Sequence, residues 1–404
     1  MKLMLLLVGV VSLLISSMGS TTAQRSELSP EAQEVYAYVA GLAGEGMIIG
    51  QFGSFGDQTN FETAQTQLER IHARSGRYPA MTGFDMYRPH RTPEQSAAEA
   101  VEYSLAKWQE GYLISLSWHS PNPCIPIDGN TYGLQWPDPV LDVTRALPGG
   151  DCHEAWMAQL DLVGGALEEL RDAGVPVFWR PLHEMNGGWF WWHRQPSPEP
   201  FVQLWRHMHD TFTERGLDNL IWVYSPNAER GDSVGPVEYY YPGDEYVDFV
   251  GLDLYMRVDD EILEINQPFD NPAFLPPRET GGYDRLLELN KPIGLFEFGP
   301  IPASGRGWDT RDYCWTDMVR DVQELYPQIV LVQAWEYVWQ IGRDPYRCQD
   351  EMMNHPYVIS LDELPWYPGA ATDSEAESTP EVEAETTPEV EPEPAATEEV
   401  SDQG

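Results

Sequence analysis

Residues 176–192 read Pro-Val-Phe-Trp-Arg-Pro-Leu-His-Glu-Met-Asn-Gly-Gly-Trp-Phe-Trp-Trp, and they indicate both a secondary structure and a kind of chemistry. The apolar run at the start has strand character and ends at Arg180, and His183 and Glu184 follow at once. Four aromatic residues come next. A site that cleaves a glycosidic bond needs an acid beside flat apolar faces that hold a sugar ring. A buried strand with a paired structural carboxylate is the alternative interpretation.

Runs of similar strand character recur along the chain and alternate with amphipathic helical stretches. The eight runs are residues 47–52, 79–84, 112–118, 175–182, 220–224, 247–254, 292–297 and 329–335. Helical stretches include residues 62–74, 93–109, 154–172, 200–215 and 310–326, and a further helix over residues 29–42 precedes the first run. This alternation predicts an α/β fold, a closed (β/α)8 TIM barrel in one domain, rather than an open doubly wound sheet. No Gly-x-Gly-x-x-Gly segment follows a predicted strand, which argues against dinucleotide binding.

The two ends of the chain differ in composition from its body. Residues 1–23 contain one lysine, an apolar run and small polar residues, which predicts a signal peptide cleaved after Ala23, with an uncleaved anchor as the alternative. Residues 370–404 hold twelve acidic residues and no basic or aromatic ones, which predicts a disordered tail. Residues 24–369 are therefore the expected catalytic domain. We expect a secreted, extracellular protein without membrane contact after signal cleavage.

The charge of the chain limits its partners. The net charge is −41, and the twelve acidic residues of the tail account for only part of it, leaving −29 on the rest. Such a body repels nucleic acids and anionic polymers such as pectin or alginate, but it does not hinder binding of a neutral plant-type polysaccharide. We expect the protein to act as a monomer.

The four cysteines fit an oxidising destination and allow three disulfide pairings. The local choices are Cys124–Cys152 and Cys314–Cys348, each of which would brace loops at the carboxyl ends of the strands. No Cys-x-x-Cys segment is present, and Gly187 stands where a His-Glu-x-x-His motif requires its second histidine. We therefore expect no metal and no cofactor.

In a (β/α)8 barrel, catalytic groups stand at the carboxyl ends of the strands. Glu184 and Glu297 follow or end the fourth and seventh runs, which lie across the barrel mouth from each other. A retaining glycosidase needs two carboxyl groups about 5–5.5 Å apart, one as nucleophile and one as acid/base. Glu297 lies in an apolar strand end, where a carboxylate needs a hydrogen-bond partner. Tyr255, at the end of the sixth run, is a suitable donor.

The motif at residues 180–192 resembles the acid/base motif of glycoside hydrolase family 26, which consists mostly of β-mannanases on a retaining (β/α)8 barrel. Shorter motifs extend the resemblance along the body: Ile49-Gly50-Gln51, Gly83-Phe84-Asp85, Ser117-Trp118-His119, Tyr241-Pro242-Gly243-Asp244, Asp253-x-Tyr255 and Glu297-Phe298-Gly299. The resemblance implies that Glu184 is the acid/base and Glu297 the nucleophile. It also implies a set of substrate-binding residues, with Trp335 under the −1 sugar: His119, His183, Trp189, Asp253, Tyr255 and Trp335.

The activity that this resemblance implies is that of a secreted endo-1,4-β-mannanase, which cleaves mannan, glucomannan or galactomannan by double displacement. Two positions near the subsites depart from the family pattern. Glu336 stands where a basic or amide residue is common, and His193 stands where glycine is usual. Because the family also contains β-1,3-xylanases and mixed-linkage β-glucanases, these activities remain alternatives. A non-catalytic carbohydrate-binding protein is a further alternative, against which the two intact glutamates argue.

Overall fold

The computed structural model describes residues 27–53, 61–88, 91–125, 141–228, 234–257, 281–301, 313–343 and 347–368. The predicted signal peptide and the predicted acidic tail lie outside these described residues. No helix in the described segments has both the length and the apolar character that crossing a bilayer requires.

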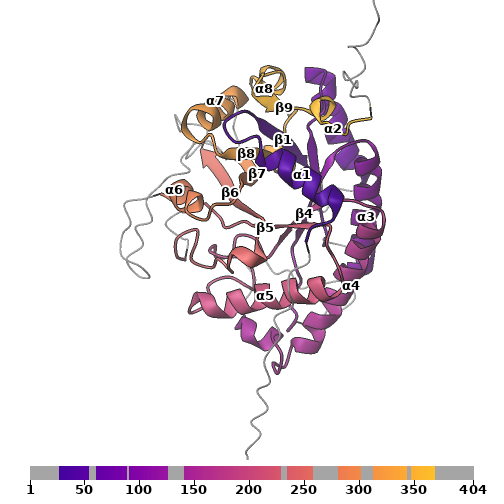
Figure 1. The fold of residues 1–404 in the computed structure, drawn as a ribbon, viewed down its shortest axis with the longest axis vertical. Helices are drawn as coiled ribbons and strands as arrows, with labels where there is room; N and C mark the ends of the chain where they lie inside the picture. Colours follow the sequence, from indigo (N-terminus) through magenta and orange to yellow (C-terminus); the bar gives the residue numbers. More distant parts are fainter. Residues whose placement is uncertain are drawn as a thin grey trace, which may run out of the picture.

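Eight parallel strands close into a barrel that is surrounded by helices (Figure 1). The first strand, β1, pairs with both β2 and β8, which closes the ring. The eight strands are β1 (Met47–Phe52), β2 (Met81–Asp85), β3 (Leu113–Trp118), β4 (Val177–Pro181), β5 (Leu220–Tyr224), β6 (Phe249–Arg257), β7 (Ile293–Ile301) and β8 (Ile329–Ala334). The predicted (β/α)8 TIM barrel is confirmed. A short strand, β9 (Val358–Ile359), pairs with the amino end of β1.

Of the seven described α-helices that follow the first strand, four begin and end within two residues of the predicted stretches, one is shorter than predicted, and two short ones lie outside those stretches. The seven helices are α2 (Phe61–Ser75), α3 (Pro93–Gln109), α4 (His153–Asp172), α5 (Pro198–Glu214), α6 (Gly282–Leu287), α7 (Trp315–Leu325) and α8 (Gln349–Met353). The boundary of α3 was predictable because Thr92 and Gln95 form a capping box and Pro93 occupies the first turn. The expected helix over residues 310–326 is shorter: α7 starts after Cys314, whose backbone is extended.

The amino-terminal end of the barrel is covered by α1 (Pro30–Ala40), which crosses in front of the strands in Figure 1. Its buried face consists of Ala32, Val35 and Val39. The ring of Tyr36 packs edge-on against Phe249, the first residue of β6, with ring centroids 6.3 Å apart. Since this end is covered, the carboxyl ends of the strands are the face available for a site.

The middle of the barrel is filled by aromatic side chains from β4, β6 and β7. The ring of Phe178 contacts those of Phe249 and Phe296 at centroid distances of 5.6 Å and 6.2 Å. A Cβ on Gly251 would lie 2.6 Å from the ring of Phe296, so this position on β6 requires glycine. Since side chains alternate along a strand, Arg180 on β4 faces the interior above Phe178.

A β-bulge in β7 changes the direction of Glu297. Leu252 of β6 pairs with Leu295, whereas Asp253 pairs with Glu297, so Phe296 is an extra residue without a partner on β6. With regular alternation, only one of Phe296 and Glu297 could face the barrel interior. The bulge lets both do so, with Phe296 in the core and Glu297 at the mouth of the barrel.

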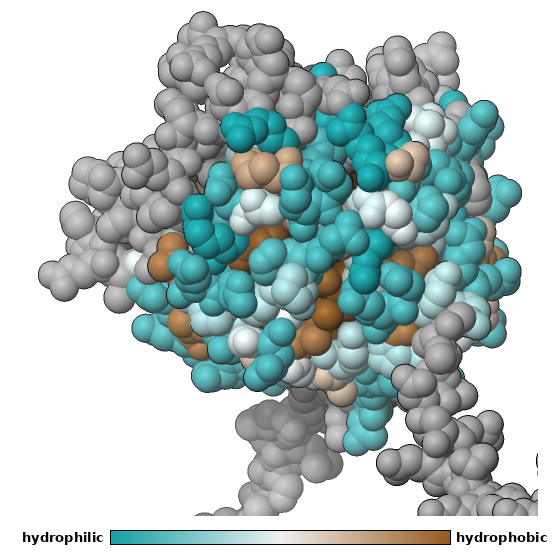
Figure 2. Space-filling view, turned by 90° about the horizontal axis from the view of Figure 1, so that it is seen from above, coloured by the Kyte–Doolittle hydropathy of each residue, from teal (hydrophilic) through white to brown (hydrophobic). Residues whose placement is uncertain are grey.

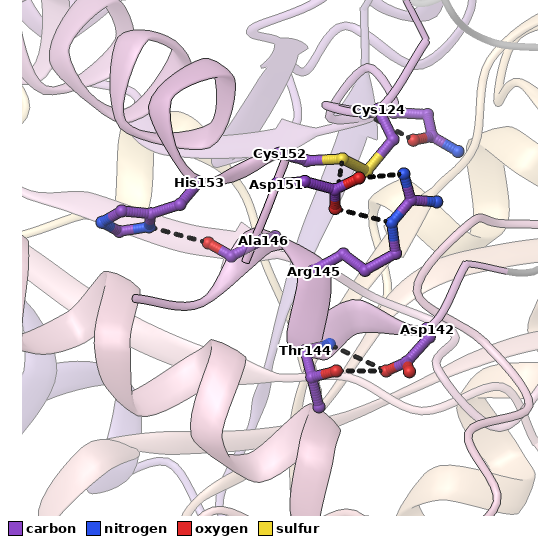
Figure 3. The surroundings of a disulfide bond; sticks show 9 residues. Cys124, Asp142, Thr144, Arg145, Ala146, Asp151, Cys152 and His153 are labelled. Carbon is purple, nitrogen blue, oxygen red and sulfur yellow. Dashed lines mark hydrogen bonds and ion pairs between the residues drawn. A yellow bond between two sulfur atoms is a disulfide. The ribbon is translucent and has the colours of Figure 1, made fainter. Parts of the chain in front are cut away.

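Both local disulfide pairings are confirmed: Cys124 is bonded to Cys152, and Cys314 to Cys348. Cys124 lies in the loop that follows the carboxyl end of β3, and Cys152 immediately precedes α4. Figure 3 shows Asp151 beside this disulfide, where its carboxylate accepts two hydrogen bonds from Arg145, both of 2.8 Å. The first bridge therefore ties the loop after β3 to the start of α4.

Hydrophilic residues dominate the face of the molecule that is drawn in Figure 2. The hydrophobic residues visible there form narrow strips between them. This distribution agrees with the low mean hydropathy of the chain, −0.42, and with its large negative charge.

Candidate active site

The carboxyl ends of the strands bring the sequence-predicted site residues together in one cluster. Contacts connect six of them, directly or through the guanidinium of Arg180, while Trp189 binds Glu184, whose carboxyl group is influenced by the charge of Glu297. The eight are His119, His183, Glu184, Trp189, Asp253, Tyr255, Glu297 and Trp335.

The carboxylate of Glu297 is held on both of its oxygens. Oε1 accepts a hydrogen bond of 2.6 Å from Nη2 of Arg180, and Oε2 accepts one of 2.6 Å from the hydroxyl of Tyr255. The predicted donation from Tyr255 is thus confirmed. Glu297 is only 4 % exposed, so these two short bonds fix the orientation of a carboxylate that has little contact with solvent.

Arg180 is the buried cation of the cluster. Its Nη1 donates a hydrogen bond of 2.8 Å to Oδ2 of Asp253, while Nη2 binds Glu297. Burial lowers the pKa of Arg180, but the negative charges of Asp253 and Glu297 outweigh this effect and leave the pKa raised. The guanidinium therefore stays charged and joins three strands, β4, β6 and β7.

Asp253 lies beneath the cluster and has no exposed surface. Its second oxygen, Oδ1, accepts a hydrogen bond of 2.7 Å from the hydroxyl of Ser225. Both carboxylate oxygens are thus occupied by protein donors. The side-chain hydrogen bonds of Asp253 are with Arg180 and Ser225, so this carboxylate supports the buried cation.

Two groups of side chains in the described residues have the spacing of metal ligands. In the first, ligand atoms of His183, Asp253 and Glu297 lie within 4.8 Å of one another. These two carboxylates already share a cation, Arg180, so an added metal would have to displace the guanidinium. In the second, Cys124 and Cys152 are joined in a disulfide and have no thiolate to offer. Neither group fits a metal ion.

The segment after β4 has an unusual backbone. Leu182 and Glu184 have positive φ angles, 45° and 52°, in the left-handed region that non-glycine residues adopt rarely and at a cost of about 1–3 kcal/mol each. Hydrogen bonds hold this conformation: the N–H of Glu184 donates to the carbonyl of Ser225 at 2.8 Å. The indole of Trp192 donates to the carbonyl of His183 at 2.9 Å.

The carboxyl group of Glu184 lies in different surroundings from that of Glu297. Oε1 accepts a hydrogen bond of 2.8 Å from Nδ2 of Asn227, and Oε2 accepts one of 2.6 Å from the indole of Trp189. Burial and the negative charge of Glu297 raise the pKa of Glu184 to about 8, although both hydrogen bonds act in the opposite direction. A carboxyl group that is protonated at neutral pH beside a second carboxylate is typical of a general acid.

Two indole rings border the pair of glutamates. Trp335 stacks on Phe52 with ring centroids 4.2 Å apart, and the guanidinium of Arg180 lies 5.9 Å from the ring of Trp335. Trp189 is half-buried and binds Glu184. Flat apolar surfaces at these positions suit the faces of sugar rings.

The two departures from the family pattern are both buried. Glu336 directly follows Trp335 and is 3 % exposed, and its negative charge raises the pKa of the buried Arg88 guanidinium, against the larger lowering effect of burial. His193 is also buried, and burial together with the charge of Arg194 lowers its pKa to about 4. His193 is therefore neutral at physiological pH.

Several functional residues were not assigned from the sequence. Arg180 was part of the quoted motif, and Asp85 belonged to one of the supporting motifs, but neither residue was assigned a role from the sequence. Ser225 and Asn227 follow β5 and carried no sequence signal. They became recognisable only through their hydrogen bonds to Asp253 and Glu184.

Comparison with known proteins agrees with this geometry. The sequence profile of glycosyl hydrolase family 26 matches residues 25–363. Mannan endo-1,4-beta-mannosidase A and B of Caldalkalibacillus mannanilyticus is 30% identical over 350 residues, which cover 82% of this chain and 61% of that protein. Mannan endo-1,4-beta-mannosidase of Bacillus subtilis strain 168 is 31% identical over 307 residues, covering 71% of this chain and 74% of that protein.

Among solved structures, the Bacillus subtilis mannanase man26 aligns with a TM-score of 0.69 and 25% sequence identity. The alignment covers 87% of this chain and 97% of the other. The match to the family profile extends over most of the chain, from the helix before the first strand to the segment after the last. The chain therefore belongs to glycosyl hydrolase family 26.

Proposed function

We propose that the protein is a secreted, monomeric, retaining endo-1,4-β-mannanase that cleaves mannan, glucomannan or galactomannan by double displacement. The relatives reported above, which are named as mannan endo-1,4-beta-mannosidases, support the substrate class. The observation that carries the mechanism is the contrast between the two glutamates. Glu297 is held by a cation and a hydroxyl, whereas the pKa of Glu184 is raised to about 8.

In the first step, Glu297 attacks the anomeric carbon of the sugar while Glu184 donates its proton to the glycosidic oxygen. The bond between the anomeric carbon and that oxygen breaks, and an ester bond between the sugar and Glu297 forms. Arg180 and Tyr255 orient the attacking carboxylate through their hydrogen bonds. Because Glu184 starts protonated at neutral pH, it can act as the acid.

In the second step, Glu184 takes a proton from water, the water oxygen attacks the anomeric carbon, and the ester bond to Glu297 breaks. Formation of the ester has removed the negative charge of Glu297, which is one of the causes of the raised pKa of Glu184. The pKa of Glu184 therefore falls in the intermediate. The same carboxyl group thus becomes a base at the stage when a base is needed.

The composition of residues 1–23 supports the proposed secretion, and the large negative charge of the chain suits a neutral polysaccharide. We expect the exported protein to begin at Gln24, which amino-terminal sequencing would check. An amino terminus at Met1 would contradict cleavage.

The substrate is tested with a panel of glucomannan, galactomannan, β-1,3-xylan and lichenan, with product sizes measured over time. We expect mannose-containing polymers to be cleaved fastest, with a rapid fall in chain length that indicates internal cleavage. Preferred cleavage of lichenan or β-1,3-xylan would instead assign the activity to a glucanase or xylanase. Glu336 is the residue that motivates this alternative, because a buried carboxylate stands at the position directly after Trp335, where a basic or amide residue is common in the family.

The roles of the two glutamates are tested with Ala variants on mannosides that carry a dinitrophenyl leaving group. Glu297→Ala should abolish cleavage, whereas Glu184→Ala should still form the intermediate, because this leaving group needs no protonation. Azide should accelerate the Glu184 variant and yield the β-mannosyl azide, as measured by NMR of the products. Early products of the unaltered enzyme should keep the β configuration. An α-configured product from either reaction would refute the assignment.

The charge of Glu297 and the hydrogen bond from Asn227 act on the pKa of Glu184 in opposite directions, so removing each should change this pKa in opposite directions. Glu297→Gln removes a negative charge that raises the pKa of Glu184, so the pKa should fall below about 8. Asn227→Ala removes a hydrogen bond that lowers this pKa, so the pKa should rise. Carbon-13 NMR titration of the carboxyl group of Glu184 measures the pKa change in both variants.

Since Glu184 must be protonated to act as the acid, kcat/KM should fall as the pH rises through about 8. In the Asn227→Ala variant this alkaline limb should move to higher pH. A limb that stays in place or moves to lower pH would contradict the assignment of Glu184 as the titrating acid.

A further inference from the structure

A chain of buried polar groups connects β2 with Glu297. It begins at Asp85, the last residue of β2, which has no exposed surface. Oδ1 of Asp85 accepts hydrogen bonds from the backbone N–H groups of Tyr87, at 2.8 Å, and His119, at 3.2 Å. Oδ2 accepts the hydroxyl of Ser117 and lies 2.6 Å from Nδ1 of His119. One carboxylate thus contacts four donors or potential donors.

Two histidines continue the chain. Nε2 of His119 lies 3.3 Å from Nε2 of His183, and Nε2 of His183 lies 3.6 Å from Oε1 of Glu297. Burial and the charge of Arg180 lower the pKa of His183 well below its usual value. The imidazole of His183 is therefore neutral and carries a single proton, on one nitrogen or the other.

The contacts favour one distribution of protons over the other. The carboxylate of Asp85 can only accept, so Nδ1 of His119 carries a proton, and in the neutral form of this imidazole Nε2 is then an acceptor. A hydrogen bond between the two Nε2 atoms, which are 3.3 Å apart, needs one proton between them. Nε2 of His183 then carries that proton. The nitrogen that carries this proton lies 3.6 Å from Oε1 of Glu297, and Nδ1 of His183 has no hydrogen-bond partner among the described residues.

We propose that Asp85 is a positioning residue that fixes the proton positions of His119 and His183, so that His183 keeps an N–H against Glu297. The inference rests on the proposed function only through the role of Glu297 as nucleophile. An N–H dipole favours negative charge on Glu297 both before attack and when the ester bond breaks. A lone pair at the same position would oppose that charge.

Asp85→Asn gives a sharp test because the position of its amide can be deduced. Two backbone N–H groups point at the Oδ1 position, so the amide oxygen must lie there. The amide nitrogen then takes the Oδ2 position and donates to Nδ1 of His119. This moves the proton of His119 to Nε2, where it would face the N–H of His183. His183 must therefore shift its own proton to Nδ1 and turn a lone pair towards Glu297.

Nitrogen-15 NMR of the full chain with labelled histidine reports which ring nitrogen carries the proton. We expect a proton on Nδ1 of His119 and on Nε2 of His183 in the unaltered protein, and the opposite arrangement in Asp85→Asn. The kcat on mannan should fall by about 10-fold to 100-fold.

Ser117→Ala is the matched control. It removes another donor to the same oxygen of Asp85 but leaves the carboxylate in place. The proton positions in both histidines should therefore remain as in the unaltered protein, and the fall in kcat should be much smaller than in Asp85→Asn. A merely structural role for Asp85 predicts similar losses in both variants without a change of tautomer.

The proposal is overturned if His119 of the unaltered protein carries its proton on Nε2, a measurement that does not depend on the folding of any variant. It is also overturned if Asp85→Asn inverts the tautomers without lowering kcat. The proposed function fails separately. If a 2-deoxy-2-fluoromannosyl reagent labels a residue other than Glu297, the nucleophile assignment is wrong whatever the histidine tautomers are.

Discussion

The site depends on one buried cation, the guanidinium of Arg180. It extends from β4 and binds Asp253 of β6 and Glu297 of β7, both at short distances. Removing one partner from a buried ion pair leaves an uncompensated charge and typically costs 3–5 kcal/mol, so these residues constrain one another strongly. The β-bulge at Phe296 belongs to the same arrangement, because without it Glu297 would not face Arg180. The cation thus fixes the relative position of three strand ends at the mouth of the barrel.

The same arrangement explains how two identical side chains can perform different chemistry. Glu297 binds the cation directly, whereas Glu184 is held by an indole and an amide and has the raised pKa of a buried acid. Part of that increase comes from the charge of Glu297 itself. The two protonation states are therefore linked, and loss of charge at one carboxylate prepares the other for the opposite role.

Hydrogen bonds and a disulfide hold the segments that carry the site residues. Leu182 and Glu184 keep strained backbone angles because Ser225 and Trp192 bind the segment from two sides. A disulfide anchors the loop after β3, which follows His119 in the chain. The hydrogen bonds hold the segment after β4 in one conformation and keep Glu184 in place, and such positioning of reacting groups is a condition for catalysis.

The sequence by itself predicted the eight strands, most of the longer helices, the hydrogen bond from Tyr255 to Glu297 and, as the local choices among three pairings, the two disulfides, and it pointed to the two glutamates as the candidate catalytic pair. These features follow from short-range patterns or from neighbours at strand ends. The tertiary structure alone decided which partners the buried polar groups take. Arg180 lies 73 residues from Asp253 and 117 from Glu297, and Asp85 lies 34 residues from His119. A bulge at Phe296 and a contact from Asn227 to Glu184 arise only when strands pair and curve, because the direction of a side chain depends on register, which local composition does not encode.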